Sequence, residues 1–395
     1  MRDGMAADLT PRATLGEIAR LFLRLGCTAF GGPAAHIAIM QHEIVERRRW
    51  VSSERFLDLL GAANLIPGPS STELAIFIGY DQAGALGLVL AGVCFLVPAA
   101  VMVTALAWAY VHFGSVPQVA GVLYGIKPVV IAVVVQALSS LAPKAIKRSA
   151  WLALLGIAAC VASALGADAL LVLVAGGFVS LVRAQLAATE GAAKSVHPGV
   201  FGILAGGGAS GALPVALLPL FLTFLKIGAV VFGSGYVLLA FLRADLVDRL
   251  HWLTERQLLD AVAIGQVTPG PIFTTATFIG YLVAARGGTV AGICGGALAT
   301  VGIFLPGFLL VGLARPLLAR VRRSATAGAF LDGVNVAALA LMAVVSFQLA
   351  RTALVDVPTV LLAAASAVAL IRFRVNATWV VGGAAVIGAA VVAAR

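Results

Sequence analysis

Two positively charged residues stand inside apolar sequence, and their side chains suit the binding of an anion. Arg24 and Lys226 each lie in a short run of Leu, Phe and Ile. A cation within a membrane segment costs about 2.5–3.5 kcal/mol on insertion scales, so such a residue is a functional candidate by default. The alternative is an ion-pair stripe in which Arg24 shares a helix face with Glu17 and Arg20. We favour anion binding, because the second half keeps a cation at Lys226 but has the uncharged residues Pro219 and Leu222 in place of Glu17 and Arg20.

Glycine and proline predict four breaks in otherwise helical sequence. Residues 30–33 read Phe-Gly-Gly-Pro and have a counterpart at 232–235, while residues 64–69 and 266–271 both end in Pro-Gly-Pro. Proline removes a backbone donor, and glycine costs about 1 kcal/mol in a helix interior. In hydrocarbon, unpaired backbone groups are tolerated only against protein or a water-filled cavity. The breaks therefore indicate a cavity, although simple kinks are the alternative.

Hydroxyl residues follow both Pro-Gly-Pro turns, with Ser70, Ser71 and Thr72 after the first and Thr274 and Thr275 after the second. The start of a half-helix presents free N–H groups and about half a unit of positive charge, which favours an oxyanion. The alternative is that these hydroxyls only cap their helices. In a repeat with inverted orientation, the two helix starts would converge near the middle of the membrane.

Two further ionisable residues lie in apolar sequence. Lys127 would add positive potential to the same cavity, unless it reaches to an interface. Glu73 is either a proton-coupling carboxylate or a counter-ion for Arg24, whereas Asp260 is expected to cap a helix or pair with Arg256. The candidate substrate-binding residues are Arg24, Lys226, Gly31, Gly32, Gly233, Ser234, Asn64, Pro67, Gly68, Pro69, Ser70, Ser71, Thr72, Gln266, Pro269, Gly270, Pro271, Thr274, Thr275 and Lys127.

The elements that must position these residues are membrane helices. Of the 395 residues 61% are hydrophobic and 11% charged, and the mean hydropathy is +1.05, whereas soluble domains are about 45–50% apolar and about 25% charged. Residues 82–126 contain no Asp, Glu, Lys or Arg, and about 20 apolar residues suffice to cross a bilayer. The composition excludes a soluble protein and predicts an all-α polytopic membrane protein.

The second half of the sequence repeats the first at an offset of 202 residues. Trp50 recurs as Trp252, and the Pro-Gly-Pro of 67–69 recurs at 269–271. After the apolar segment 86–110 the first half lacks basic residues where the second half has four arginines. After the next span the first half has three basic residues, whereas the second half has Arg351 offset by Asp356. Positive residues mark the cytoplasmic side, so the halves are predicted to be inverted-topology repeats with broken or re-entrant helices.

The chain is predicted to divide into an N-terminal transporter repeat at 1–185, a linker at 186–212 and a C-terminal repeat at 213–395. Its four cysteines lack metal-ligand spacing, and no metal or cofactor is expected. The sequence lacks the phosphate-binding loop of ATP-driven pumps. It also lacks the motifs of intramembrane hydrolases, so we do not expect an enzyme.

Several motifs coincide in one known family. His36 follows the Phe-Gly-Gly-Pro of 30–33, both Pro-Gly-Pro turns are followed by Phe-Ile-Gly-Tyr, and residues 125–128 read Gly-Ile-Lys-Pro. In this combination the sequence resembles chromate ion transporters of the long-chain, two-domain form over both halves. The resemblance implies a multi-pass transporter of the plasma (inner) membrane that exports chromate and confers chromate resistance.

Electrostatics favours the same direction of transport. A dianion that leaves a negative cell interior gains about 2.3 kcal/mol per charge per 100 mV, whereas import needs a coupling ion. The alternative is an importer of sulfate or another inorganic anion, for which Glu73 would be the coupling residue. A channel or a scaffold would not need paired cations. The expected partners are a chromate-like or sulfate-like oxyanion and the lipid bilayer, with no nucleic acid; a homodimer is left open.

Overall fold

The computed structural model describes residues 12–30, 32–114, 116–147, 149–189, 217–231, 237–322 and 324–394. Within these ranges the chain is helical and contains no strand, which confirms the predicted fold class. Five helices are long and apolar enough to cross a membrane, and they contain the segments Ser70–Phe113, Val119–Ile146, Ala169–Leu186, Thr289–Leu313 and Thr326–Ala353.

The described helices fall into two series in the same order. The first series is α1 (Leu15–Thr28), α2 (Gly32–Gln41), the π-helix η1 (His42–Arg47), α3 (Ser53–Ala63), α4 (Ser70–Phe113), α5 (Pro117–Ile146), α6 (Ala150–Ala164) and α7 (Ala169–Thr189). The second series is α8 (Leu217–Val230), α9 (Leu238–Leu242), the π-helix η3 (Arg243–Arg249), α10 (Glu255–Val267), η4 (Ile272–Thr274), α11 (Thr275–Ala284), η5 (Ala285–Gly287), α12 (Thr289–Arg322), α13 (Ala325–Ala353), α14 (Val357–Ile371) and α15 (Ala377–Ala393).

The duplication extends to details of the backbone. Helices α1 and α8 are both 14 residues long and begin 202 positions apart. Each half then forms a π-helical turn, and after it Arg49 and His251 adopt left-handed conformations, with φ of 54° and 50°. Non-glycine residues rarely adopt positive φ, so two such residues at equivalent positions indicate that the two halves share one backbone fold. The two homologous halves expected from the sequence are thus confirmed.

The first helix of the chain is short because both of its ends are specified locally. Thr14 and Glu17 form a capping box at the start of α1, which satisfies two otherwise unpaired backbone N–H groups. Glu17 is therefore a capping residue, and the interpretation of an ion-pair stripe with Arg24 along α1 is wrong. At the other end, Ala29 is extended, with φ −81° and ψ 98°, just before the glycines and proline that stop the helix.

Helix α4 contains a reversal of the chain. Ala83 and Gly84 have non-helical dihedral angles, with φ 62° at Gly84, which favours glycine there. A Cβ placed on Gly79 would overlap the carbonyl of Gly87, although residues eight apart in a straight helix lie about 12 Å apart. The segment 70–82 is therefore a separate half-helix that packs against the long remainder of α4.

Helix α3 and the first segment of α4 form a re-entrant hairpin. Arg55, at the start of α3, is ion-paired with Asp81 at the far end of the 70–82 segment, so the two helices run antiparallel and the Pro-Gly-Pro loop lies at the tip. Eleven residues of α3 rise about 16 Å, roughly half of the bilayer's hydrocarbon thickness. Helices α10 and α11 repeat the arrangement in the second half, which confirms the expectation of re-entrant helices.

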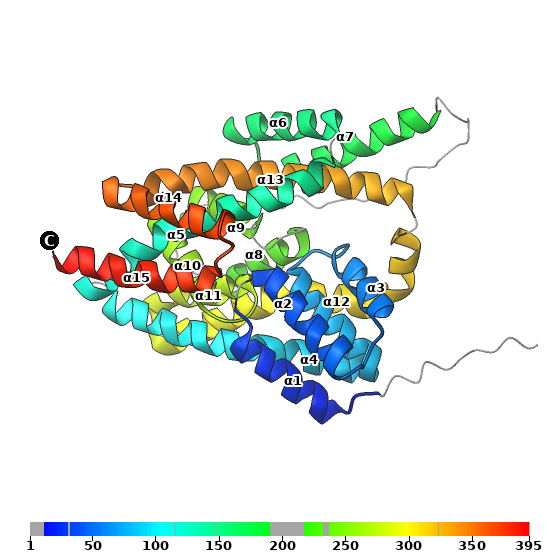
Figure 1. The fold of residues 1–395 in the computed structure, drawn as a ribbon, viewed down its shortest axis with the longest axis horizontal. Coiled ribbons are helices and arrows are strands. Elements are labelled where there is room, and N and C mark those ends of the chain that lie inside the picture. Colours follow the sequence, from blue (N-terminus) through cyan, green and yellow to red (C-terminus); the bar gives the residue numbers. More distant parts are fainter. Residues whose placement is uncertain are drawn as a thin grey trace, which may run out of the picture.

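The two halves run in opposite directions. In Figure 1, α4 and α12 lie along the lower part of the molecule, and the colour gradient progresses from right to left in the long part of α4 after Gly84 but from left to right in α12. Helices α5 and α13 are likewise opposed. Because the long helices define the direction of the membrane normal, this is the inverted repeat that the loop charges predicted.

Tight packing near glycines joins each first helix to its long helix, and the buried apolar core lies along these contacts. A Cβ on Gly26 of α1 would lie 2.6 Å from the Phe95 carbonyl oxygen of α4, and a Cβ on Gly228 of α8 would overlap the Ile303 carbonyl of α12. Small residues allow such close approach of membrane helices. The short helices that carry the candidate residues are therefore held rigidly.

Candidate anion-binding site

The tips of the two hairpins are fixed to the opposite halves of the molecule. The Gly68 N–H donates to the carbonyl of Val231 (2.8 Å), which follows α8, and the Gly270 N–H donates to the carbonyl of Ala29 (2.9 Å), which follows α1. Both glycines have positive φ, 128° and 96°, a conformation that L side chains rarely adopt. The four breaks predicted from the sequence thus meet in two cross-half pairs.

His36 connects these two pairs. Its Nε2 lies 3.0 Å from the Ala29 carbonyl oxygen and its Nδ1 lies 3.3 Å from Ser71 Oγ, at the start of α4. The ring is buried and also packs edge-on against Phe95. This arrangement agrees with the structural role that a lone histidine most often has.

Four of the nine buried side-chain atoms that lack a hydrogen-bond partner in the described residues lie at the two hairpin tips. Within the described part of the chain, no partner is found for Thr72 Oγ1 and Glu73 Oε2 in the first half or for Gln266 Nε2 and Thr275 Oγ1 in the second. Buried polar groups are nearly always satisfied in folded proteins, so each such group needs an explanation. A bound oxyanion between the tips would accept hydrogen bonds from the hydroxyls and the amide.

The other sequence-predicted residues of the loops are placed as follows. Pro67, Pro69, Pro269 and Pro271 are buried in the two loops, Ser70 begins α4, Thr274 donates to the Pro271 carbonyl, and Gly32 begins α2 with φ 78°. Asn64 is the C-cap of α3 and is exposed, unlike the buried amide nitrogen of its counterpart Gln266. Gly31, Gly233 and Ser234 lie outside the described residues.

Glu73 fills the space between the first Pro-Gly-Pro loop and the second half. Its carboxylate touches the loop so closely that a Cβ on Gly68 would overlap Oε1, and a Cβ on Gly307 of α12 would lie 2.8 Å from the same oxygen. The side chain is buried, and the described residues give it no ion pair. Since Arg24 pairs elsewhere, Glu73 is not the counter-ion of Arg24, which was one of the two alternatives.

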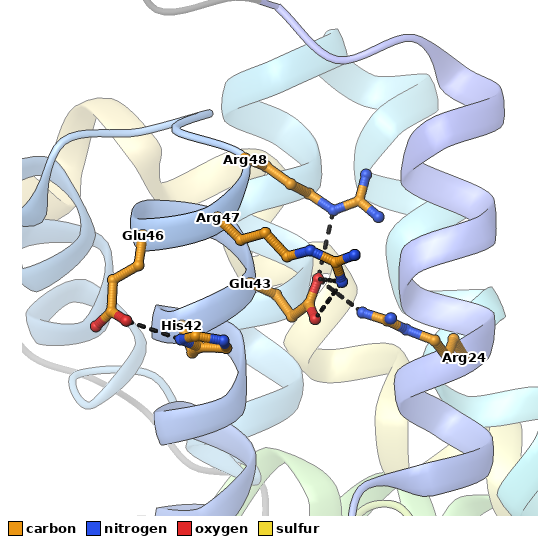
Figure 2. A network of polar contacts seen from close by, with 6 residues as sticks. All are labelled: Arg24, His42, Glu43, Glu46, Arg47 and Arg48. Carbon is orange, nitrogen blue, oxygen red and sulfur yellow. Dashed lines mark hydrogen bonds and ion pairs between the residues drawn. The ribbon is translucent and has the colours of Figure 1, made fainter.

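Arg24 belongs to a cluster of arginines around one carboxylate. Figure 2 shows Glu43 of η1 between three guanidinium groups. Arg24 lies 2.7 Å from its carboxylate, Arg47 lies 3.1 Å away and Arg48 lies 3.6 Å away. Burial raises the pKa of Glu43, but the hydrogen bonds from Arg24 and Arg47 outweigh that effect and hold the pKa below its usual range. The carboxylate therefore stays charged.

Lys226 belongs to an equivalent cluster in the second half. Asp245 of η3 lies 2.9 Å from the Lys226 ammonium and 2.9 Å from the Arg249 guanidinium. The offset of 202 residues relates each of the three to a member of the first cluster. Sequence reasoning missed Glu43 and Asp245, although this same offset, together with their position 19 residues after each cation, was a signal that could have found them.

Lys127 is not directed into a shared cationic cavity with Arg24. It forms a buried ion pair with Asp260 of α10 (2.8 Å), and Tyr110 of α4 donates a hydrogen bond to the other carboxylate oxygen (2.9 Å). The expectation that Asp260 pairs with Arg256 is wrong for this reason. The ion pair joins α5 of the first half to the re-entrant hairpin of the second. Asn335 is the counterpart of Lys127, so the second half lacks the cation.

A groove among the described residues does not suit an anion. It has a volume of about 700 Å³ and lies between α4, α11 and α12, with a lining that is almost entirely apolar. Two of its hydroxyls, those of Thr277 and Thr300, are hydrogen-bonded to each other at 2.6 Å. A site for a charged ligand needs a few convergent polar groups, which this groove lacks.

Comparison with known proteins agrees with this architecture. The family model described as chromate transporter matches residues 16–181 and 218–389. The chain is 35% identical over 315 residues to a chromate transport protein of Cupriavidus metallidurans, covering 78% of this chain and 75% of the relative. It is 33% identical to a chromate transport protein of Pseudomonas aeruginosa, covering 78% and 74%, and 33% identical to a probable chromate transport protein of Synechococcus elongatus, covering 78% and 77%. No solved structure matches this fold.

Proposed function

The chain belongs to the chromate transporter family, and we propose that it is a secondary transporter that exports chromate across the plasma membrane and so confers chromate resistance. The observation that carries this proposal is the set of unpartnered buried polar atoms at the two hairpin tips, from Thr72, Gln266 and Thr275. Chromate is a tetrahedral dianion with four acceptor oxygens. Hydroxyl and amide donors at the hairpin tips of both halves suit such a ligand and would hold it between the inverted repeats.

The helix geometry at the tips favours an anion. The first half-helix of α4 and the helix η4–α11 both begin directly after a Pro-Gly-Pro loop. Helix starts carry a partial positive charge, which strengthens hydrogen bonds to an oxyanion where water is excluded. Arg24 and Lys226 add positive potential from the two clusters. Binding between repeats that open in turn to either side would give alternating access.

The membrane potential supplies the driving force for export. A dianion that moves from a negative interior to the outside gains about 4.6 kcal/mol at 100 mV, twice the value for one charge. Export therefore requires no further energy source. Glu73 is the candidate for coupling, since its buried carboxyl group lies beside the first loop and can take up a proton when an anion binds nearby.

Glu73 also favours a second candidate function, the uptake of sulfate or a similar inorganic anion together with protons. Protonation of a carboxylate next to an anion site removes a repulsion, so proton and anion binding would be cooperative. Import against the membrane potential needs such coupling. The two functions differ in the direction of net transport and in whether a pH gradient can drive it.

Chromate accumulation in everted membrane vesicles tests the proposal. These vesicles expose the cytoplasmic side, so an exporter accumulates chromate inside when respiration makes the lumen positive. We expect accumulation by the wild type, and loss of most of it in the double variant Thr72→Val/Thr275→Val, which removes two unpartnered hydroxyls at nearly constant shape. Thr104→Val is the matched control, because the Thr104 hydroxyl already donates to the Ala100 carbonyl at 2.7 Å.

The outcomes distinguish a wrong substrate assignment from a wrong binding site. Wild-type vesicles that accumulate no chromate would refute chromate export, and sulfate accumulation driven by an imposed pH gradient would favour the second function. Accumulation that is equal in the wild type and the double variant would show that the hairpin tips do not bind the substrate. Arg24→Ala and Lys226→Ala test the two cationic clusters in the same assay.

A further inference from the structure

The carboxylates Glu43 and Asp245 occupy positions in which an oxyanion would fit. Each lies between two cations, Arg24 and Arg47 in the first half and Lys226 and Arg249 in the second, at 2.7–3.1 Å. The carboxylate oxygens accept hydrogen bonds as the oxygens of a bound tetrahedral anion would. The protein's own acid therefore stands where a substrate anion could bind.

The cations of both clusters are accessible, while the carboxylates are not. The side chains of Arg24 and Arg47 are 44% and 59% exposed and that of Glu43 is 10% exposed. In the second cluster, Lys226 and Arg249 are 38% and 50% exposed and Asp245 is 6% exposed. The cations therefore have surface that the protein does not cover, on which an anion can bind without any rearrangement of the helices that carry them.

Both clusters also carry more positive than negative charge. Three guanidinium groups against one carboxylate leave a charge of +2 in the first cluster, and one ammonium and one guanidinium against one carboxylate leave +1 in the second. A purely structural ion pair needs no surplus of cations, and the neighbouring Arg243 of η3 is shared by two carboxylates, Asp248 and Glu255. The surplus favours binding of a further anion.

The two clusters lie toward opposite ends of the antiparallel helices α4 and α12. Helix α1 packs along α4 at Gly26, and α8 packs along α12 at Gly228 in the same way. Because α4 and α12 run in opposite directions (Figure 1), the equivalent clusters are inverted with respect to each other. An anion that crosses the membrane would meet one cluster before the hairpin tips and the other after them.

We propose that Glu43 and Asp245 are built-in competitors of the substrate, and that each cluster is a docking site from which an arriving tetrahedral dianion displaces the carboxylate. The identity of the anion rests on the proposed function. A dianion gains more than a carboxylate from two cations, so displacement favours dianions over monovalent anions. The returning carboxylate then helps to expel the ion, as conduction requires binding that is weak enough to leave.

Equilibrium binding of radiolabelled sulfate to the purified full-length protein in lipid nanodiscs tests this inference. Sulfate is a stable tetrahedral dianion. Glu43→Gln and Asp245→Asn remove the competing charge but keep the shape of the side chain, and we expect each to tighten sulfate binding by about tenfold or more, in line with the strength of a charge-assisted hydrogen bond. Glu43→Asp keeps the competitor and should bind sulfate like the wild type.

Each variant has a matched control. Glu46→Gln and Asp248→Asn remove the same charge from the same two π-helices, at positions related by the same offset of 202 residues, but these carboxylates do not contact Arg24 or Lys226. Figure 2 shows Glu46 turned away from the arginine cluster, toward His42. We expect less than about a twofold change in both controls, since exposed charges interact weakly through water.

Three results would overturn the inference. Weaker sulfate binding by Glu43→Gln and Asp245→Asn would mean that the carboxylates only hold the cations in place. If the control variants bound sulfate more tightly by the same factor, the change in affinity would come only from the net charge of the protein. If no variant bound sulfate, docking at the clusters would be excluded. If the wild type transports no chromate but these variants tighten sulfate binding, the docking sites stand and the chromate assignment fails.

Discussion

The two halves of the molecule share one backbone design but differ in their buried ionisable side chains. Both have a cationic cluster, a re-entrant hairpin with a Pro-Gly-Pro tip, and a glycine that donates across to the other half. Only the first half has Glu73, since the corresponding helix start of the second half holds Thr274 and Thr275, and only the first half has Lys127, whose counterpart is Asn335. Duplicated features therefore suit the path of the anion, and unique features suit coupling and the joining of the halves.

Removal of Lys127 is expected to have the largest effect on stability. Lys127→Met leaves Asp260 buried without its cation, and breaking a buried ion pair from one side typically costs about 3–5 kcal/mol. Thermal unfolding of the protein in detergent should show a clear drop in the melting temperature.

Two further variants make this result specific to the pair. Asn335→Met changes the equivalent position of the second half and should destabilise the protein much less, because the structure records no ion pair there. Lys127→Met combined with Asp260→Asn should recover most of the loss, since it removes both charges. A double variant as unstable as the single one would assign the cost to lost packing.

Substitution of the loop glycines is expected to have a smaller effect that is similar in both halves. Gly68→Ala and Gly270→Ala place a side chain at φ 128° and 96°, and a disfavoured backbone conformation costs about 1–3 kcal/mol. The new methyl group would also meet Glu73 in the first loop and lie 2.7 Å from Ala99 Cβ in the second. Both variants should lose chromate accumulation and melt at lower temperature.

A glycine in open space serves as the control for both. A methyl group on Gly382 of α15 would have no neighbouring atom within 4 Å, so Gly382→Ala should retain transport and stability. If only one of the two loop variants lost transport, the loops would have unequal roles, and the symmetry of the proposed anion path would be refuted.

The coupling role of Glu73 predicts a functional difference between the halves. At a fixed membrane potential, Glu73→Gln should reduce the response of chromate accumulation to an imposed pH gradient by about tenfold, which lies within the usual range of coupling between sites. Thr274→Val changes an uncharged residue at the corresponding helix start of the second half and should keep the response. An unchanged response in Glu73→Gln would exclude this residue from proton coupling.

The fold was accessible from the sequence because its causes are local. Long apolar runs require helices in a bilayer, and the pairs of glycine and proline at 67–69 and 269–271 require breaks. The repeat then relates the breaks to each other, and loop charges orient the halves. Chain reversal at Gly84 was not predicted, because a single glycine in an apolar run gives no distinct signal.

The partners of the charged residues were harder to predict. The sequence identified Arg24, Lys226 and Lys127 as cations within apolar sequence, yet their partners Glu43, Asp245 and Asp260 lie on other helices. Which carboxylate meets which cation depends on helix packing, and hydropathy does not encode it. The cross-half contacts of Gly68 and Gly270 depend in the same way on the assembled repeats.

The hairpin of the first half contains an ion pair that the second half lacks, and its removal should have the smallest effect. Arg55 pairs with Asp81, whereas the equivalent places in the second half hold Gln257 and Leu282. Arg55→Gln should lower the free energy of unfolding by less than about 1 kcal/mol, because partly exposed pairs contribute little. Added salt should reduce this small difference, since it screens exposed charges. A loss of several kcal/mol would instead mean that the first hairpin depends on this pair, and that the two hairpins are held in their re-entrant form by different forces.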